Sequence, residues 1–146
     1  MIAPAKQQGI YPNFMPSADS AIPMIATPDV SRLVAGLLTA PAPRSEVVDL
    51  LGPAYSPRQL AERLGAALGR PLRIVDVPAA GHVAALQQAG LSAQMAEAVA
   101  ELYAAFAAGL IVPHGDRSLA GTTTIDEVLA GLLAAGAGER SLEPRA

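Results

Sequence analysis

Few side chains in this 146-residue chain are of types that suit proton transfer. His82 lies at the start of a helical segment in "AAGHVAAL", and an imidazole exchanges its proton near neutral pH. It would therefore serve as a general acid or base toward a small molecule. The structural alternative is a half-buried histidine in a first helical turn, with no chemical role.

Two aspartates interrupt apolar runs, Asp49 in "VVDLL" and Asp76 in "IVDVP". A carboxylate that faces inward at such a position would become a second acid or base. The alternative is a solvent-facing position in a strand whose side chains alternate between two faces. We predict His82 and Asp49 as the catalytic residues.

Metal and nucleophilic chemistry find little support. His114 and Asp116 form a His-x-Asp pair, but two ligands are fewer than a metal site needs, and a solvated loop explains them equally well. The chain has no cysteine and no nucleophile-elbow motif. We therefore predict no metal site.

The segment "YPNFMP" gathers large side chains in an apparent loop. Tyr11, Phe14 and Met15 supply apolar surface and Asn13 a polar handle. Together with Tyr103 and Phe106 from a later helix, they would line a hydrophobic pocket for a small molecule. The alternative is a loop that plugs the core.

The elements that must position these residues alternate. Strand-like runs and capped helices follow each other from residue 21 onward, which favours an α/β fold with partly parallel pairing. Local signals include capping boxes at Ser56/Gln59 and at Thr124/Glu127. We expect four to five helices and about three short strands (21–27, 45–53 and 70–78). So small a sheet has open edges, and dimerisation would complete it.

Composition limits the partners. A formal charge of −3 with only 10 Lys and Arg argues against nucleic acid and anionic membranes. No secretory signal and no long apolar run is present, so we expect a cytoplasmic protein. The Ala-, Arg-, Gly- and Pro-rich composition suggests a GC-rich bacterial genome.

Several segments in order resemble the NmrA-like, NAD(P)H-binding branch of the atypical short-chain dehydrogenases. They are "IPMIATPDVSRLVAGLLTAP", "VVDLLGP", "YSPRQLAERLGAALGRPLRIVDVP", "AGLSAQMAEAVAELYAAFAAGLI" and "TTTIDEVLAG". The resemblance implies an incomplete Rossmann-derived layer, because it covers only the C-terminal, substrate-side part of that family. It implies a substrate-side domain over residues 22–135. Residues 1–21 contain several prolines and no clear period, which predicts an irregular entry segment, and residues 136–146 are predicted to be a flexible tail.

The family's coenzyme machinery cannot be transferred to this chain. No G-x-G-x-x-G cluster follows any predicted strand, so a backbone cradle for a pyrophosphate is lacking. The Tyr-x-x-x-Lys pair of classical members is absent too, since Lys6 is the single lysine. We therefore predict no cofactor bound by this sequence alone.

Three functions remain open. The first is a nicotinamide-independent biosynthetic enzyme, of isomerase, cyclase or dehydratase type, acting on a hydrophobic substrate. The second is a subunit of a split NAD(P)H-dependent oxidoreductase, completed by a Rossmann-containing partner. The third is a non-catalytic regulatory or interaction module, since the resembled branch includes coenzyme-sensing regulators.

Overall fold

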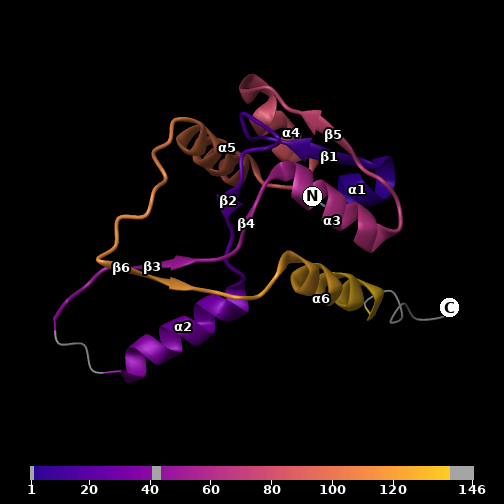
Figure 1. Cartoon of the computed structure of the whole chain (residues 1–146). Coiled ribbons are helices and arrows are strands. Elements are labelled where there is room, and N and C mark those ends of the chain that lie inside the picture. The colour runs from indigo at the N-terminus through magenta and orange to yellow at the C-terminus, as the bar shows by residue number, and fades with distance from the viewer. Residues whose placement is uncertain (1, 41–43, 139–146) are drawn as a thin grey trace. The chain divides into compact units, whose positions relative to one another are not determined.

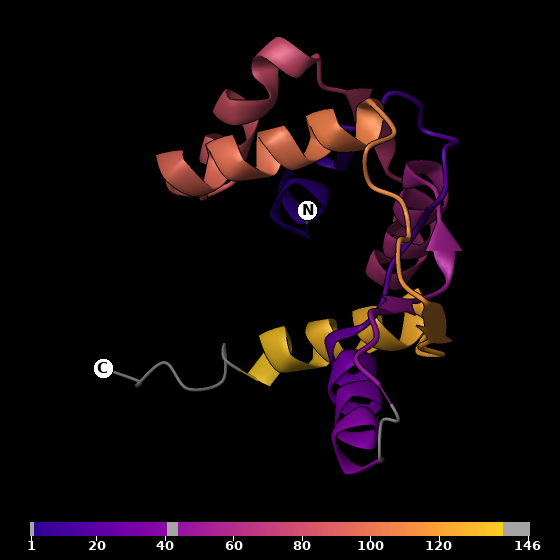
Figure 2. The ribbon, with the colours of Figure 1, turned by 90° about the vertical axis from the view of Figure 1, so that its left-hand side faces the viewer.

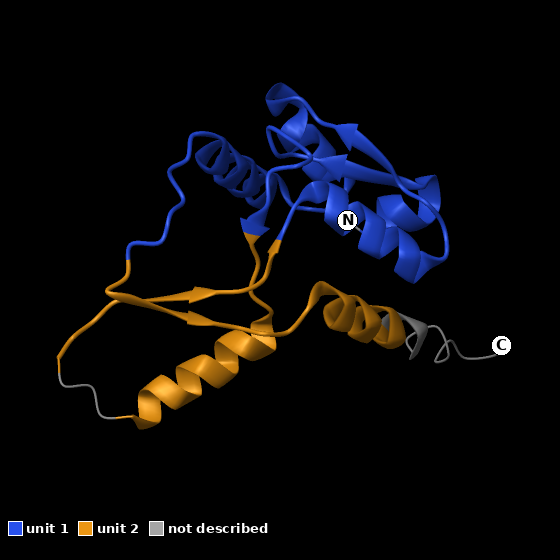
Figure 3. Cartoon of the chain, viewed as in Figure 1, with its two compact units in different colours: residues 1–22, 55–114 blue, residues 23–54, 115–146 orange. Residues whose placement is uncertain are grey.

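The computed structural model describes residues 2–40 and 44–138, which form two compact units. Unit 1 comprises Met1–Ile22 and Tyr55–His114, and unit 2 comprises Pro23–Ala54 and Gly115–Ala146 (Figure 3). Two-residue strands, β2 (Ile22–Pro23) and β4 (Ala54–Tyr55), pair where the chain passes from one unit to the other.

Unit 1 is built on a parallel pair of strands, β1 (Ile10–Asn13) and β5 (Arg73–Asp76), which align Ile10 with Arg73 and Asn13 with Asp76 (Figure 1). The carbonyl of Gly9 accepts from Arg73 N in β5, and the carbonyl of Asn13 accepts from Val77 N directly after β5. Alternate residues of a strand turn their backbone N–H and C=O groups to opposite sides, and Gly9 and Asn13 turn theirs toward β5. The backbone of Pro12 therefore points away from β5, so the N–H group that proline lacks is not needed for this pairing.

Helix α3 (Pro57–Leu68) packs against β5 and against α1 (Ile2–Gln8). Its predicted capping box is present. The Ser56 hydroxyl accepts from Gln59 N at 3.2 Å, and Gln59 Oε1 accepts from Ser56 N at 3.0 Å. The helix ends at Gly69, whose φ of 67° is the left-handed conformation that glycine adopts without strain.

The apolar core of unit 1 lies between β1 and a pair of helices, α4 (His82–Gln88) and α5 (Ala93–Ala107). Figure 2 shows these two helices side by side, and they pack directly on each other. A short 3₁₀ turn, η1 (Ala79–Gly81), connects β5 to α4. Phe14, Leu86 and the fully buried Ala96 form the centre of this core.

Unit 2 contains a second parallel pair, β3 (Val48–Leu51) and β6 (Arg117–Ala120), with Val48 opposite Arg117. Its helices are α2 (Thr27–Thr39) and α6 (Ile125–Gly138). The second predicted capping box begins α6, since Thr124 Oγ1 accepts from Glu127 N and Glu127 Oε2 accepts from Thr124 N. Asp29 in α2 is fully buried.

The predicted α/β class and the parallel pairing are confirmed, but the count of elements is not. The described residues contain six α-helices and six short strands in three two-stranded sheets, whereas about three strands and four to five helices were expected. The description of 1–21 as irregular is wrong for α1 and β1. The predicted tail is outside the described residues from residue 139 onward, and residues 136–138 belong to α6.

Helix α5 contacts the core through small side chains. Met95 and Leu102 are 54% and 46% exposed, while Ala96 is fully buried. Alanine permits closer helix packing than a long side chain, so Ala96 and Tyr103 define the buried face. None of the helices in the described ranges has the length and hydropathy to cross a membrane.

Candidate functional site

A cavity of about 470 Å³ in unit 1 lies among the ends of both strands and two helices. The loop after β1 and the end of β5 supply one part of its lining, and α4 and α5 supply the rest. The lining residues are Phe14, Met15, Pro16, Asp76, Val77, Pro78, Ala79, His82, Ala100, Tyr103, Ala104 and Ala107. This volume lies within the range of small-molecule sites.

Three aromatic rings meet at this cavity. The Phe14 and Tyr103 rings stack with centroids 5.1 Å apart and planes 16° apart. The His82 ring stands edge-on to both, with centroids 5.2 Å from Phe14 and 5.8 Å from Tyr103. Stacked and edge-on pairs at such distances are favourable, so the cluster is a rigid apolar wall.

His82 is held in one orientation. Its Nε2 lies 3.0 Å from the carbonyl oxygen of Val77, and the residue is only 7% exposed. The Val77 carbonyl follows β5 directly, so the strand fixes the imidazole within the cavity wall. The predicted catalytic histidine therefore lines the same cavity as Phe14, Met15 and Tyr103, and its catalytic role stays a prediction.

Asn13 holds the cavity's shape rather than facing it. Its Nδ2 donates to Asp76 Oδ1 at 2.7 Å and to the Met15 carbonyl at 3.1 Å, while its Oδ1 accepts from Met15 N at 3.0 Å. With 3% exposure and these three bonds, the side chain has little left for a ligand. These bonds position the Phe14–Met15 loop and Asp76, and the substrate-binding role of Asn13 stays a prediction.

Two tyrosines lie in apolar surroundings. Burial, with a smaller effect of the neighbouring Tyr103, raises the pKa of Tyr11 to about 12. Burial also raises the pKa of the Tyr103 phenol. Tyr11 is 7% exposed and does not line the cavity, so its place is in the supporting core beneath it.

Two further predicted site residues are not part of this cavity. Phe106 follows Tyr103 on α5 but does not line it. Asp49 belongs to unit 2, where its Oδ2 accepts the N–H of Gly115 at 2.6 Å. A Cβ on Gly115 would lie 2.9 Å from that same oxygen, so this contact requires glycine. Asp49 and His82 therefore belong to different units, and a catalytic role for Asp49 stays a prediction.

The one formally charged side chain in the lining of the cavity is negative. Asp76 is the acidic residue of its lining, and no Lys or Arg is present there, so the walls offer hydrogen-bond acceptors and no cation for a phosphate. Within the described ranges, no group of three or more His, Cys, Asp or Glu is arranged to hold a metal ion. His114, which was considered as a ligand beside Asp116, is exposed.

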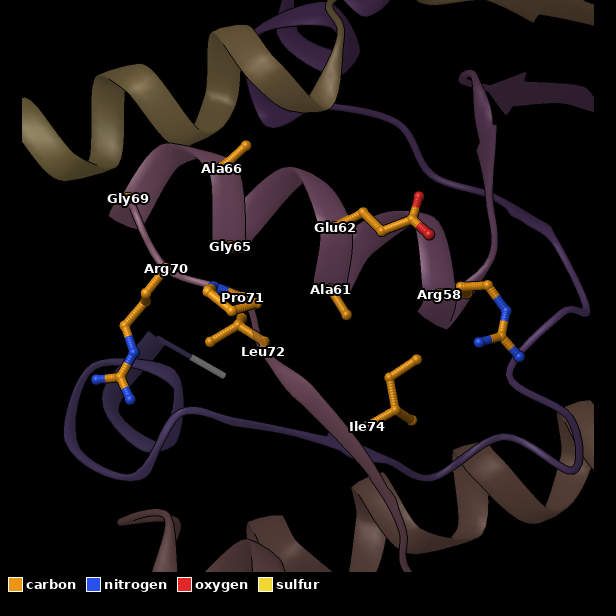
Figure 4. A pocket seen from close by; sticks show the side chains of 10 residues that line it. All are labelled: Arg58, Ala61, Glu62, Gly65, Ala66, Gly69, Arg70, Pro71, Leu72 and Ile74. Carbon is orange, nitrogen blue, oxygen red and sulfur yellow. The ribbon is translucent and has the colours of Figure 1, made fainter.

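A second hollow of about 510 Å³ lies between α3 and β5 (Figure 4). Figure 4 shows Ala61, Leu72 and Ile74 between Arg58 and Arg70, which stand at opposite ends. Arg58 is engaged by Asp19 at 2.6 Å, and Arg70 Nη1 donates to the Lys6 carbonyl at 3.2 Å. This hollow has one carboxylate, Glu62, but no aromatic ring and no histidine in its lining, so the ring-lined cavity is the stronger candidate site.

The comparisons with known proteins give one partial similarity. The chain is 30% identical over 92 residues to an NAD(P)H azoreductase of Xenophilus azovorans, a match that covers 62% of this chain and 32% of that protein. No family model matches the chain, and no solved structure matches it. The coenzyme in the azoreductase's name agrees with the NAD(P)H-binding family that the sequence resembles.

The lining also contains residues that were not among the predicted site residues, although Asp76 was considered as a carboxylate in an apolar run. Asp76 joins the cavity because the register of β1 and β5 places it opposite Asn13, 63 residues away. Ala100, Ala104 and Ala107 line the cavity along one side of α5. Their spacing of four and three residues was the available signal, but alanines are common in this chain and did not stand out.

Proposed function

We propose that unit 1 binds a flat, apolar small molecule in the cavity beside Phe14, His82 and Tyr103. The observation that carries this proposal is the ring cluster on a cavity of about 470 Å³. Aromatic walls attract planar ligands through stacking and edge contacts. The alanines of α5 leave the space that larger side chains would have filled.

The reaction we propose is proton transfer without a nicotinamide, as in isomerisation, cyclisation or dehydration in the cytoplasm of a bacterium. His82 would be the acid or base, because it lines the cavity and its ring is held in place by the Val77 carbonyl. A ligand that binds but is never transformed would instead favour the non-catalytic regulatory or interaction module.

A specific observation favours a second candidate, the substrate-side part of an NAD(P)H-dependent reductase. It is the similarity to the NAD(P)H azoreductase, of which this chain spans about a third. In that case a Rossmann-containing partner would supply the coenzyme. Native mass spectrometry separates the two candidates when a Rossmann-containing partner chain is added together with NADPH, since a complex of both chains with the coenzyme would favour the reductase.

Self-association is a related proposal. The parallel pair of β1 and β5 has two strands in the described part of the chain, and parallel sheets of that size are rarely stable without further cover. Leu38 in unit 2 and Met95 in unit 1 are 82% and 54% exposed. A homodimer would cover such surface, and the same native mass spectrum reports the number of subunits.

The binding proposal has a direct test within one helix. Ala104 and Ala98 both lie on α5 and are both exposed, but only Ala104 lines the cavity. Ala104→Leu would fill the cavity, whereas Ala98→Leu adds the same side chain elsewhere on the helix. The probe is 2-methoxynaphthalene, a flat and uncharged molecule, titrated into the full chain and followed by NMR.

We expect the probe to bind wild type and Ala98→Leu equally and Ala104→Leu at least tenfold more weakly, since a filled cavity excludes it. The resonances of Phe14 and Tyr103 should shift on binding. Equal binding by all three proteins, or binding that shifts neither ring, would place the ligand elsewhere and end this proposal.

A further inference from the structure

The hydrogen bond of His82 decides which of its ring nitrogens carries a proton. A backbone carbonyl can only accept, so Nε2, at 3.0 Å from the Val77 oxygen, must be the donor. In the neutral imidazole the other nitrogen, Nδ1, is then an acceptor with a free lone pair.

The Nδ1 atom has no hydrogen-bond partner among the residues that the structure describes. The Val77 carbonyl is the hydrogen-bond partner of the His82 ring, and it is bound through Nε2. No buried side-chain nitrogen or oxygen of the described residues both lacks a partner and is sealed from solvent, so Nδ1 must be reachable. His82 is 7% exposed and lines the cavity, which therefore gives access to this nitrogen.

A second polar side chain of the cavity also favours a ligand that donates a hydrogen bond. Asp76 uses Oδ1 to accept from Asn13 and adds a second acceptor, the carboxylate, to the lining. No lining residue is Lys or Arg, so an anionic ligand would meet one negative charge and no positive one. Besides the Tyr103 hydroxyl, which can donate or accept, the polar side chains of the lining are acceptors next to an aromatic wall.

From these contacts we propose that the ligand is an aromatic molecule carrying a neutral hydrogen-bond donor, a phenol-type hydroxyl or an N–H, which donates to Nδ1 of His82. Its ring packs on the exposed surface of the Phe14–Tyr103 stack. This inference rests on the proposed function, because it specifies the ligand of the same cavity. In this proposal His82 determines which ligands bind, because its Nδ1 accepts a hydrogen bond from the ligand.

The test compares three probes of similar size on the full chain: 2-naphthol, 2-methoxynaphthalene and 2-naphthoate. Naphthol can donate, its methyl ether cannot, and naphthoate is an anion. We expect naphthol to bind roughly threefold to tenfold more tightly than the ether, the effect of one net hydrogen bond. Naphthoate should bind most weakly.

Two substitutions at His82 separate the roles of the two nitrogens. The terminal amide of His82→Gln reaches the position of Nε2 and keeps the donor to Val77, but it leaves no acceptor at Nδ1. His82→Asn places its side-chain oxygen near the position of Nδ1. We expect the preference for naphthol over its ether to vanish in His82→Gln and to persist in His82→Asn.

A spectroscopic readout covers the case in which a variant does not fold. In wild type, the ¹⁵N resonance of His82 Nδ1 should be that of an unprotonated nitrogen and should shift with naphthol but not with its ether. Equal affinity for naphthol and the ether, or a proton on Nδ1 of the free neutral ring, would overturn this inference while leaving the proposed function intact. If no probe binds, the proposed function itself fails.

Discussion

Thr123 donates two hydrogen bonds to the buried carboxylate of Asp29, from its backbone N–H at 2.8 Å and from its hydroxyl at 2.9 Å. Arg32, three residues after Asp29 on α2, adds an ion pair at 2.7 Å. The carboxylate therefore ties the first turn of α2 to the segment before α6, 94 residues away. Within unit 2 this is the contact that gives the two helices a common anchor.

Gly121 leaves the space in which that carboxylate lies. A Cβ at this position would be 2.6 Å from Asp29 Oδ2, closer than real atoms approach. We expect Gly121→Ala to lower the free energy of unfolding of the protein by about 1–3 kcal/mol, the usual effect of overpacking. Chemical denaturation followed by circular dichroism measures it.

The matched control is Gly36→Ala in the middle of α2, where an added Cβ meets nothing within 4 Å. Alanine in a helix interior should stabilise the protein by roughly 0.5–1 kcal/mol relative to glycine. If both substitutions changed stability in the same direction, steric contact with Asp29 would not be the reason that position 121 is glycine.

Acid should weaken unit 2 through Asp29. The hydrogen bonds from Thr123, and more weakly the charge of Arg32, lower the pKa of the Asp29 carboxyl below its usual value. As the pH falls, the Asp29 carboxyl therefore takes up its proton in the unfolded chain before it does so in the folded chain. The stability that the ionised carboxylate contributes is present above its pKa in the unfolded chain and is lost as the pH falls through its pKa in the folded chain. We expect the Tm to fall steeply from about pH 5 to pH 2, and Asp29→Asn to flatten that slope.

A surface pair provides the comparison. The hydrogen bond from Arg58 lowers the pKa of Asp19, but both side chains are exposed. Asp19→Asn should change how the Tm depends on pH only at low salt. At about 1 M salt this difference from wild type should vanish, because exposed charges are screened. The Asp29 effect should survive the same salt. An Asp29 effect that disappears in salt would mean that the carboxylate is open to solvent.

Tyr11 should affect stability at the opposite end of the pH scale. Its pKa of about 12 in the folded protein exceeds the usual value near 10, because the buried phenolate is disfavoured. As the pH rises, Tyr11 loses its proton at a higher pH in the folded chain than in the unfolded chain. The stability contributed by the protonated phenol is therefore complete below pH 10 and is lost as the pH rises from 10 to 12.

The loss attributable to Tyr11 is about 2–3 kcal/mol across that interval, from two pKa units. Urea unfolding at pH 9, 10 and 11 follows the first half of this loss, about 1.4 kcal/mol, and Tyr11→Phe should make the alkaline decline shallower. Absorbance at 295 nm tests the pKa itself, since a Tyr11 signal complete by pH 11 would contradict the burial of its hydroxyl.

Local signals in the sequence predicted the helix ends well. The capping boxes at Ser56/Gln59 and Thr124/Glu127 involve residues three apart, and both are present in the structure. Ser92 caps α5 in the same local way, since its hydroxyl accepts from Met95 N. These bonds form within one turn of chain, so the pattern alone determines them.

Pairings between distant segments were not predictable in the same way. Strand β1 was missed because its partner begins 63 residues later and because Pro12 suggested a loop. Strand β6 was missed for the same reason, since Arg117 lies opposite Val48. At the candidate site, Phe14, Met15, His82 and Tyr103 were found from residue type, whereas Asp76 required the register.

The hydrogen bond between Asn13 and Asp76 provides a last test of how the cavity is held. Asn13 Nδ2 lies 2.7 Å from Asp76 Oδ1. The same side-chain amide donates to the carbonyl of Met15 and accepts from its N–H. Bonds to a charged group contribute roughly 1.5–3 kcal/mol, and groups in direct contact couple energetically. A double-mutant cycle of Asn13→Ala and Asp76→Ala should therefore give a coupling of about 1–2 kcal/mol.

Asn13→Ala should cost more than Asp76→Ala, because it also frees the backbone of Met15 and so loosens the loop that carries Phe14. The readouts are the free energy of unfolding and the affinity for 2-methoxynaphthalene. If Asn13 positions the cavity wall, its loss weakens probe binding although it does not line the cavity. Additive stabilities together with unchanged probe binding in Asn13→Ala would show that the amide fixes neither Asp76 nor the ring of Phe14.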